Sequence, residues 1–205
     1  MVKTDQKPIK PATKKRAVAP LRRPNSALRS REHLTQAEVE KLIAATKKNR
    51  YGHRDATMLL VAYRHGLRAA EVVDLRWEQI DWNSATLHVQ RVKNGKASTH
   101  PIRGDELRAL RKLKREAPTS PFVFVSERCG PFTTDSFNWM VKRAGHKAGL
   151  PFQVHAHMLR HAAGYKLAGD GHDTRSIQDY LGHKNIQHTV RYTELSPQRF
   201  KDFWR

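Results

Sequence analysis

The chain has 205 residues, which is enough for one ordinary domain with a short appendage. Its formal net charge of +20 and its sequence pI near 10.6 point to a polyanionic partner, and nucleic acid is the commonest one. A hydrophobic content of 38%, without any apolar run of roughly 18 residues, excludes a membrane-spanning protein. The single cysteine, Cys129, excludes an intramolecular disulfide. Because the basic N-terminus also has no apolar segment typical of a secretory signal, we expect a cytoplasmic protein.

Residues 1–31 form a strongly basic segment. They contain ten Lys or Arg, one acidic residue and four Pro, so they cannot bury enough apolar surface to fold alone. We predict that residues 1–31 are a disordered basic arm and that residues 32–205 form the folded domain. The arm is either a tether that binds DNA without sequence preference or a solvated tail.

Two helices open the predicted domain. Thr35 and Glu38 have the spacing of a capping box, in which each side chain accepts a hydrogen bond from the other residue's backbone amide. A first helix is therefore predicted to begin at Thr35 and run to about Thr46. A second helix, at about residues 54–65, is nearly continuous in its apolar residues and should be central.

The segment after the second helix presents an arginine. Gly66 ends the helix, and the turn that follows aims Arg68 out of a buried corner. Glu71, one turn further on, is placed to hold the guanidinium. The competing interpretation is an ordinary structural Arg–Glu pair.

The apolar period then changes from that of a helix to that of a strand. Leu87, Val89 and Arg91 alternate with polar residues, which is typical of a half-buried strand. Asn94-Gly95 is the strongest two-residue signal for a hairpin with a type I′ turn. Residues 98–102 should return antiparallel to the first strand.

The remaining elements complete a mostly helical α+β fold with a small antiparallel three-stranded sheet. We predict basic amphipathic helices at residues 105–115 and 133–148, with Phe122–Val125 as the third strand. Ser196-Pro197 should begin a last short helix. Its apolar face includes Phe200, Phe203 and Trp204, and we expect this face to be buried on its own subunit or on a neighbour.

The stretch from His155 to Tyr192 carries the chemistry. His157, Arg160 and His161 fall on one helical face, and a helix from Asp173 should end at Gly182. An arginine with two imidazoles suits a pentavalent phosphate, and a tyrosine hydroxyl can attack phosphorus covalently. No acidic residue stands beside them in the sequence to hold a metal, so the pattern favours phosphoryl transfer by hydrogen bonds alone. A zinc site built from three histidines is a weaker alternative; it would use His155, His157 and His161.

The combination His157-x-x-Arg160, then Leu181-Gly182-His183, then Tyr192 resembles the C-terminal signature of the tyrosine recombinases. The resemblance covers about residues 32–205 and is greatest to the small fimbrial phase-variation recombinases. It implies the tyrosine recombinase catalytic-domain fold. It also implies a site-specific recombinase that cleaves and rejoins DNA through a 3′-phosphotyrosyl intermediate, inverting or integrating a DNA segment. We expect the basic arm to stand where the wider family has an N-terminal DNA-clamping domain.

The resemblance also implies catalytic roles. Tyr192 is the nucleophile, Arg68 and Arg160 clamp the non-bridging oxygens, and His183 donates to them. His157 assists the removal of the tyrosine proton. Lys93, just before the predicted hairpin turn, is the general acid, and Lys96 is a less suitable substitute for it. His161 is interpreted as a structural support of the loop.

The expected partner is double-stranded DNA with paired recombination sites, bound by a homotetramer on synapsed DNA and by a monomer or weak dimer off DNA. No cofactor or metal is expected. The residues expected to contact DNA are Arg91, Lys96, Lys142, Arg143, Lys147, Lys184 and Arg191. Two alternatives stay open: a relaxing enzyme of the type IB topoisomerase kind, and a DNA-binding regulator without catalysis.

Overall fold

The computed structural model of the protein describes residues 31–92, 95–128, 130–194 and 200. The predicted basic arm lies outside the described residues except for Arg31. The predicted last helix also lies outside them except for Phe200, which is 51% exposed. Within the described part of the chain, no helix is long and apolar enough to cross a membrane.

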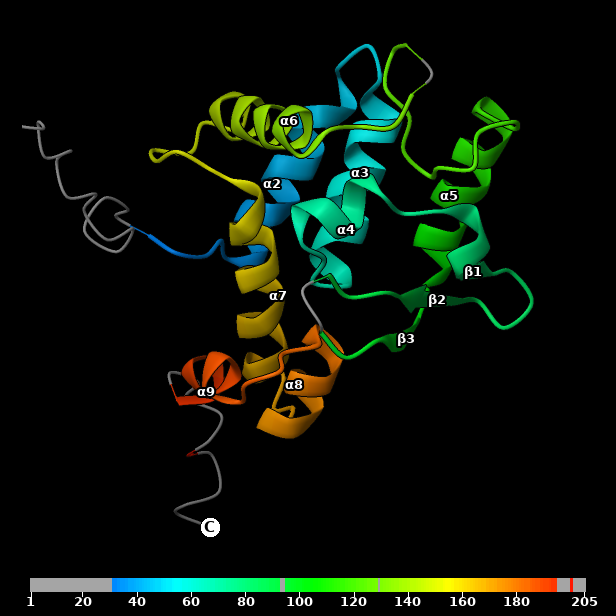
Figure 1. Ribbon diagram of the computed structural model, residues 1–205. Helices are drawn as coiled ribbons and strands as arrows, with labels where there is room; N and C mark the ends of the chain where they lie inside the picture. The colour runs from blue at the N-terminus through cyan, green and yellow to red at the C-terminus, as the bar shows by residue number, and fades with distance from the viewer. Residues whose placement is uncertain (1–30, 93–94, 129, 195–199, 201–205) are drawn as a thin grey trace, which may run out of the picture. The chain divides into compact units, whose positions relative to one another are not determined.

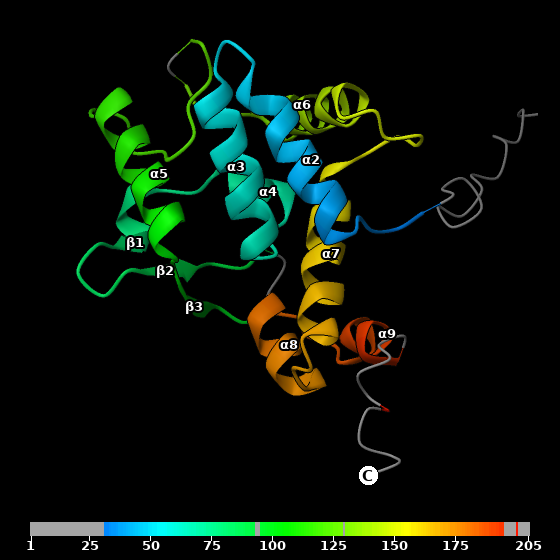
Figure 2. The same ribbon diagram turned by 180° about the vertical axis from the view of Figure 1, so that it is seen from behind.

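The first two helices form where their end signals predict. Helix α2 spans Gln36–Lys47, and its N-cap Thr35 makes the predicted capping box with Glu38. Helix α3 spans Gly52–Arg64 with His65 as its C-cap, and the next residue, Gly66, has a φ of 55°, the left-handed conformation that suits glycine. Figure 2 shows α3 between α2 and α5, so α3 is the central helix of this side, as expected.

The fold is mostly helical with a three-stranded antiparallel sheet, as predicted. Strand β1 is Ile80–Asp81, β2 is Thr86–Val89 and β3 is Ser98–Pro101. The strands lie in the order β1-β2-β3, with Ile80 opposite Leu87.

The prediction that Phe122–Val125 is the third strand is wrong. The sheet takes β1 instead, and this segment makes only isolated bridges, from Phe122 to Arg76 and from Val125 to Pro131. Its middle residues, Val123 and Phe124, are both buried. A strand on a one-sided sheet alternates between buried and exposed residues, so this continuous burial suits an irregular core segment better.

The prediction of a tight two-residue hairpin is also wrong. Val89 pairs with Ser98 at the end of the ladder, so the described residues 90–92 and 95–97 lie outside it. The chain after β2 turns inward instead, because Arg91 is buried and Gly95 packs closely against the backbone of Gly182. Residues 93–94 lie outside the described part of this loop.

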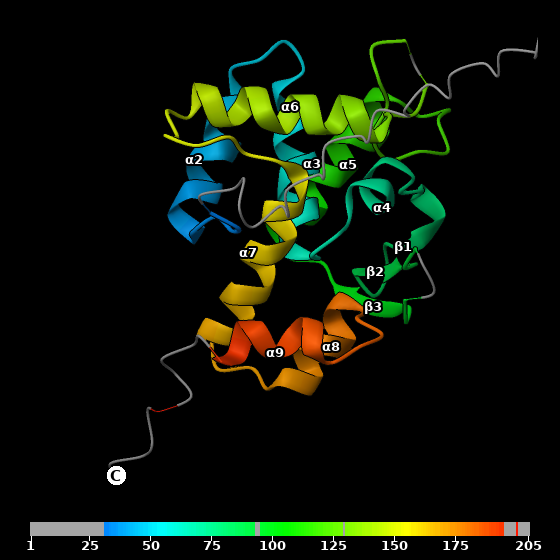
Figure 3. The same ribbon diagram turned by 60° about the vertical axis from the view of Figure 1, so that its left-hand side comes forward.

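The remaining helices build the other side of the core and lead to the site. Helix α5 is Gly104–Glu116 and α6 is Thr134–Lys147, close to their predicted bounds. Helix α7 is Ala156–Gly169, α8 is Thr174–Leu181 and α9 is Gln187–Glu194. Helix α7 runs from α6 at one end to α8 and α9 at the other (Figures 1 and 3). It therefore links the core to the helix that bears Tyr192.

Candidate functional site around Tyr192

Helix α7 carries the first group of expected site residues. It begins after its N-cap His155, whose backbone is extended with φ of −137° and ψ of 158°. His157, Arg160 and His161 follow at i, i+3 and i+4 and so share one helical face. Near this face α7 packs against both α8 and α9.

Arg160 is a buried cation that joins two turns of the chain. Only 1% of the residue is exposed. Its Nη1 donates to the Gly66 carbonyl at 2.5 Å and its Nη2 to the Leu181 carbonyl at 2.7 Å. Burial and then the charges of Arg68 and Arg91 lower the pKa of Arg160 to about 9, so the guanidinium remains charged at neutral pH. The turn after α3 and the end of α8 are thereby held together.

Arg68 lies in the first of these turns, as the N-cap of α4 (Ala69–Val73). Its Nη1 donates to Glu71 Oε1 at 2.8 Å, and its backbone N–H donates to Glu71 Oε2 at 2.9 Å. The prediction that Glu71 holds this guanidinium is confirmed. The Arg68 side chain is 25% exposed while that of Glu71 is 2% exposed. The buried Glu71 carboxylate therefore fixes the Arg68 guanidinium, and the exposed part of the guanidinium remains accessible to a ligand.

Tyr192 lies on α9 with its hydroxyl turned toward α7. The residue is 2% exposed, and its hydroxyl oxygen is 2.9 Å from His161 Nδ1. Burial raises the pKa of Tyr192 to about 12. A Cβ on Gly164 would lie 2.7 to 2.8 Å from the Tyr192 ring. Only a glycine at this position of α7 lets the ring pack this closely against the helix.

The imidazole beside the tyrosine belongs to His161 and not to His157. The two imidazole rings meet edge to face, with centroids 4.4 Å apart, and His157 is the exposed one. Burial, and then the neighbouring charges, lower the pKa of His161 to about 3, so this ring is neutral at physiological pH. A neutral His161 can accept the tyrosine proton at Nδ1. The sequence shows that His157 and His161 share a face but not which ring meets α9.

The histidine cluster does not form a metal site among the described residues. No group of three or more His, Cys, Asp or Glu side chains in that part of the chain is arranged to hold a metal ion. The zinc alternative for His155, His157 and His161 therefore has no support in their geometry.

His183 follows α8, which ends as predicted at Gly182 in the left-handed conformation, with φ of 65°. Its Nδ1 is 2.8 Å from Thr189 Oγ1, and Thr189 is fully buried. Its ring lies over that of Tyr192 at 25° with the centroids 6.2 Å apart. Burial lowers the pKa of His183 to about 3. The structure thus brings His183 next to Tyr192.

Lys93, the expected general acid, lies outside the described residues. Its substitute candidate Lys96 is described and is 2.9 Å from Asp179 Oδ1, with 72% of the lysine side chain exposed. This pair joins the loop between β2 and β3 to α8. The loop therefore approaches the end of the helix that leads to His183.

Most of the residues expected to contact DNA are exposed. Lys142, Arg143 and Lys147 are exposed on α6, where the Lys142 Nζ lies 5.1 Å from the ring centroid of Trp139. Lys184 is exposed after α8. Arg191 forms an ion pair with Glu32, and its side chain is 41% exposed.

The expectation that Arg91 contacts DNA is wrong for this structure. Its side chain is fully buried and bonded to Glu71 at 2.9 Å. The alternation of the strand places Arg91 on the same face as Leu87 and Val89. Because both of those residues are buried, this pattern predicts burial of Arg91 and not contact with DNA. Arg91 therefore belongs to the interior of the site.

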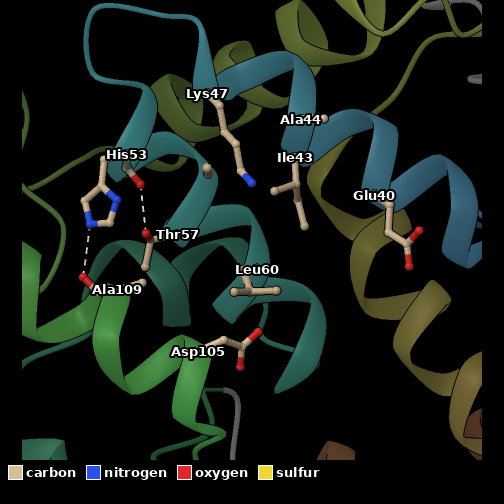
Figure 4. A pocket seen from close by; sticks show the side chains of 10 residues that line it. Glu40, Ile43, Ala44, Lys47, His53, Thr57, Leu60, Asp105 and Ala109 are labelled. Carbon is tan, nitrogen blue, oxygen red and sulfur yellow. Dashed lines mark hydrogen bonds between the residues drawn. The ribbon is translucent and has the colours of Figure 1, made fainter.

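A pocket of about 590 Å³ opens elsewhere, between α2, α3 and α5. Figure 4 shows His53 bridging it through a 3.1 Å contact from its Nε2 to the Ala109 carbonyl oxygen. None of the described residues expected for catalysis lines this pocket. The described residues expected for catalysis therefore lie outside this hollow.

Comparison with known proteins agrees with the geometry. The chain matches the model of the phage integrase family over residues 32–199. The type 1 fimbriae regulatory protein FimE of Escherichia coli (strain K12) is 41% identical over 180 residues, which are 85% of this chain and 91% of that protein.

Solved structures give the same result for the fold. The crystal structure of XerA recombinase superimposes with a TM-score of 0.72 at 25% identity, covering 90% of this chain and 69% of that one. The XerH site-specific recombinase bound to its difH substrate has a TM-score of 0.69 at 21% identity, covering 80% of this chain and 50% of that one. This second likeness concerns the fold alone.

Proposed function

The chain belongs to the phage integrase family and is a tyrosine-type site-specific DNA recombinase, and on that premise we propose that Tyr192 is the nucleophile. The observation that carries this proposal is the 2.9 Å contact between the Tyr192 hydroxyl and His161 on the helix that also bears Arg160. A hydroxyl with an adjacent neutral base is the arrangement that nucleophilic catalysis requires.

In the proposed reaction the Tyr192 hydroxyl oxygen forms a bond to the scissile phosphorus, and the bond from phosphorus to the 5′ oxygen breaks. The products are a 3′-phosphotyrosyl bond and a 5′-hydroxyl. The 5′-hydroxyl of a partner strand then attacks the phosphotyrosine and releases Tyr192. Because the covalent bond conserves the phosphodiester energy, the cycle needs no nucleotide cofactor.

The proposed clamp consists of Arg68, Arg160 and His183. Arg68 and Arg160 lie close enough that, after burial, the charge of Arg68 is the next largest cause of the lowered pKa of Arg160. The His183 ring lies over the Tyr192 ring. Donors of this kind act on the non-bridging oxygens, where negative charge grows in the transition state. A fixed Arg68 loses little freedom in doing so, because Glu71 already holds it.

For the tyrosine proton, we propose that His161 accepts it first and that His157 assists through the adjacent ring. The pKa values of about 12 for Tyr192 and about 3 for His161 oppose proton transfer in the free protein. Transfer must therefore accompany the formation of the oxygen–phosphorus bond, which acidifies the phenol. Lys93 is proposed as the acid that protonates the leaving 5′ oxygen.

We further propose that the protein acts as a tetramer on two paired DNA sites in the bacterial cytoplasm and nucleoid. The exposed cations of α6, together with Lys184 and Arg191, would bind the phosphate backbone. The reaction would invert or integrate a DNA segment. The similarity to FimE, a fimbriae regulatory protein, supports inversion of a segment that controls transcription.

The test is covalent trapping on a DNA site that carries a nick beside the cleavage position, taken from DNA next to the protein's own coding sequence. The wild-type protein should form an SDS-stable adduct even in saturating EDTA. Tyr192→Phe should bind the DNA without forming the adduct. Tyr165→Phe is the matched control, because its ring packs on Tyr192 at a centroid distance of 5.0 Å, and it should still form the adduct. An adduct with Tyr192→Phe would overturn the proposal.

A further inference from the structure

Arg91 is a buried cation to which the proposed chemistry assigns no role. Its side chain is fully buried, and removing a guanidinium from water costs several kcal/mol unless bonds replace the lost hydration. Burial lowers the pKa of Arg91. So costly a placement needs compensation. The hydrogen bonds that Nη1 and Nη2 of Arg91 make supply it, whereas the buried Nε has no hydrogen-bond partner among the described residues.

The first set of bonds ties together separate segments of the chain. Arg91 Nη2 donates to the His65 carbonyl at 3.2 Å and to the Tyr180 carbonyl at 2.5 Å, while Nη1 donates to the Gly66 carbonyl at 3.3 Å. Arg160 donates to the same Gly66 carbonyl at 2.5 Å. Arg91 and Arg160 are therefore both bonded to the turn before Arg68 and to the end of α8.

The second set of bonds passes through Glu71. Its Oε2 accepts from Arg91 Nη1 at 2.9 Å, and its Oε1 accepts from the Val92 amide at 3.2 Å. The same carboxylate holds the Arg68 guanidinium at 2.8 Å. Burial acts to raise the pKa of Glu71, but the bonds from Arg68 and the charge of Arg91 outweigh it and lower the pKa. The carboxylate is thus an ionised link between Arg68 and the loop after β2.

The third observation is steric. A Cβ on Gly95 would lie 2.7 Å from Arg91 Cβ and 2.9 Å from the Gly182 carbonyl oxygen. A Cβ on Gly182 would lie 2.6 Å from Arg91 Cγ and 2.7 Å from the Lys96 carbonyl oxygen. Gly95 and Gly182 therefore pack directly against the aliphatic part of the Arg91 side chain, and neither position has room for a side chain.

We propose that Arg91 is a positioning residue for strand cleavage, because it holds the Arg68 turn, the loop between β2 and β3 and the end of α8 in one arrangement. This inference rests on the proposed roles of Arg68 and His183, the residues that it places. Arg91 itself does not reach the DNA.

The experiment measures single-turnover adduct formation on the nicked site, with the protein saturating, for Arg91→Met and a matched control. Arg54→Met is the control. Arg54 likewise pairs with a carboxylate, Asp55, at 2.8 Å and donates to the Val125 carbonyl at 3.0 Å, away from the site. Arg91→Met loses a buried ion pair and Arg54→Met a partly buried one, so both variants should melt at a lower temperature. Rates are compared at a temperature at which circular dichroism shows both variants folded.

We expect Arg91→Met to cleave at least about tenfold more slowly than wild type. Removing one oxyanion donor costs roughly a hundredfold in rate, and misplacing such donors should cost less than removing one. Its dissociation constant for the uncleaved DNA site should change by less than about threefold, since the binding cations are elsewhere. Arg54→Met should cleave at the wild-type rate. If Arg91→Met does not fold, Arg91→Lys replaces it, since an ammonium keeps the charge but cannot bind four acceptors at once.

Three results would overturn the inference: a folded Arg91 variant that cleaves at the wild-type rate, equal slowing of both variants, or a loss confined to DNA binding. The proposed function fails separately, if Tyr192→Phe still forms the adduct. A wild-type adduct that depends on Tyr192, together with an unaffected Arg91 variant, would remove only the positioning role.

Discussion

Tyr192 and His161 are held in a resting arrangement in which both are neutral. The phenol is buried with a pKa of about 12, and the imidazole that it faces has a pKa of about 3. Water cannot readily reach the hydroxyl, because only 2% of the residue is exposed. Spontaneous ionisation of Tyr192 is therefore suppressed, and in the proposed reaction the bound phosphate and its clamp supply the driving force.

The identity of the proton acceptor can be tested by the pH dependence of cleavage. His161 stays neutral from pH 5 to 8, so the wild-type single-turnover rate should be level over that range. His161→Gln should lower the rate by at least about a hundredfold at pH 7, the scale of general-base catalysis. Its rate should also rise about tenfold per pH unit, because hydroxide must then remove the proton.

His157→Gln is the comparison for this measurement. Because we propose that His157 acts through His161, the rate loss of His157→Gln should be smaller and its pH profile should stay level between pH 5 and 8. A sloping profile for His157→Gln and a level one for His161→Gln would show that His157 is the direct acceptor.

Among the secondary-structure elements, local sequence signals predict the ends of helices but not how the elements pack against one another. Helix α2 was predictable because Thr35 and Glu38 form a capping box within four residues of each other, and α8 because Gly182 ends it. The third strand was not predictable, since Phe122–Val125 has strand-like composition but packs in the core. Which of two histidines meets Tyr192 depends on where α9 docks, and no local pattern carries that information.

The docking of α9 on α7 depends on a glycine. Gly164→Ala would place a Cβ 2.7 to 2.8 Å from the Tyr192 ring, so the ring must move away from His161. Cleavage should then fall at least about tenfold, although alanine itself favours a helix by about 0.5 to 1 kcal/mol over glycine.

Gly169→Ala is the matched control on the same helix, because its Cβ would meet nothing within 4 Å. It should keep the wild-type cleavage rate in the same single-turnover assay. Wild-type cleavage by Gly164→Ala would show that the contact between α7 and α9 does not set the position of the nucleophile.

The sheet and α8 share a buried histidine that should make stability depend on pH. His100 is fully buried, contacts Ser98 at 2.8 Å and stacks on Tyr180, and burial lowers its pKa from 6.5 to about 3. Between pH 6.5 and about 3, His100 is protonated in the unfolded chain and neutral in the folded chain. The free energy of unfolding should therefore fall as the pH falls from 6.5 toward 3, by up to about 1.4 kcal/mol per pH unit.

Urea unfolding between pH 7 and 4 measures this contribution. His100→Gln should reduce the slope of the free energy of unfolding against pH. The control His88→Gln replaces an exposed imidazole on the neighbouring strand and should keep the slope. Equal slopes for wild type and His100→Gln would mean that this histidine does not titrate differently in the two states.

At the scale of the whole molecule, the net charge of +20 is unevenly distributed along the sequence. Residues 1–30 contain nine Lys or Arg and one acidic residue. Arg31 is different, because it binds the Glu38 carboxylate at 2.7 and 2.8 Å and so belongs to the folded domain. This division gives a natural point at which to remove the arm.

Deletion of residues 1–30 should weaken DNA binding without changing which site is preferred. Each phosphate contact that is lost should reduce the slope of log K against log salt by roughly 0.9. The measurement is binding to a specific and to a random duplex across a salt series. An unchanged slope would show that the arm is a solvated tail.

Mapping the covalent bond between the protein and the DNA tests most directly whether Tyr192 is the nucleophile. The trapped wild-type adduct is digested with nuclease and protease, and the modified peptide is sequenced by mass spectrometry. We expect a 3′-phosphonucleotide on Tyr192, in the peptide that contains His188 and Arg191. The same modification on Tyr165, on Tyr180 or on any residue other than Tyr192 would contradict it.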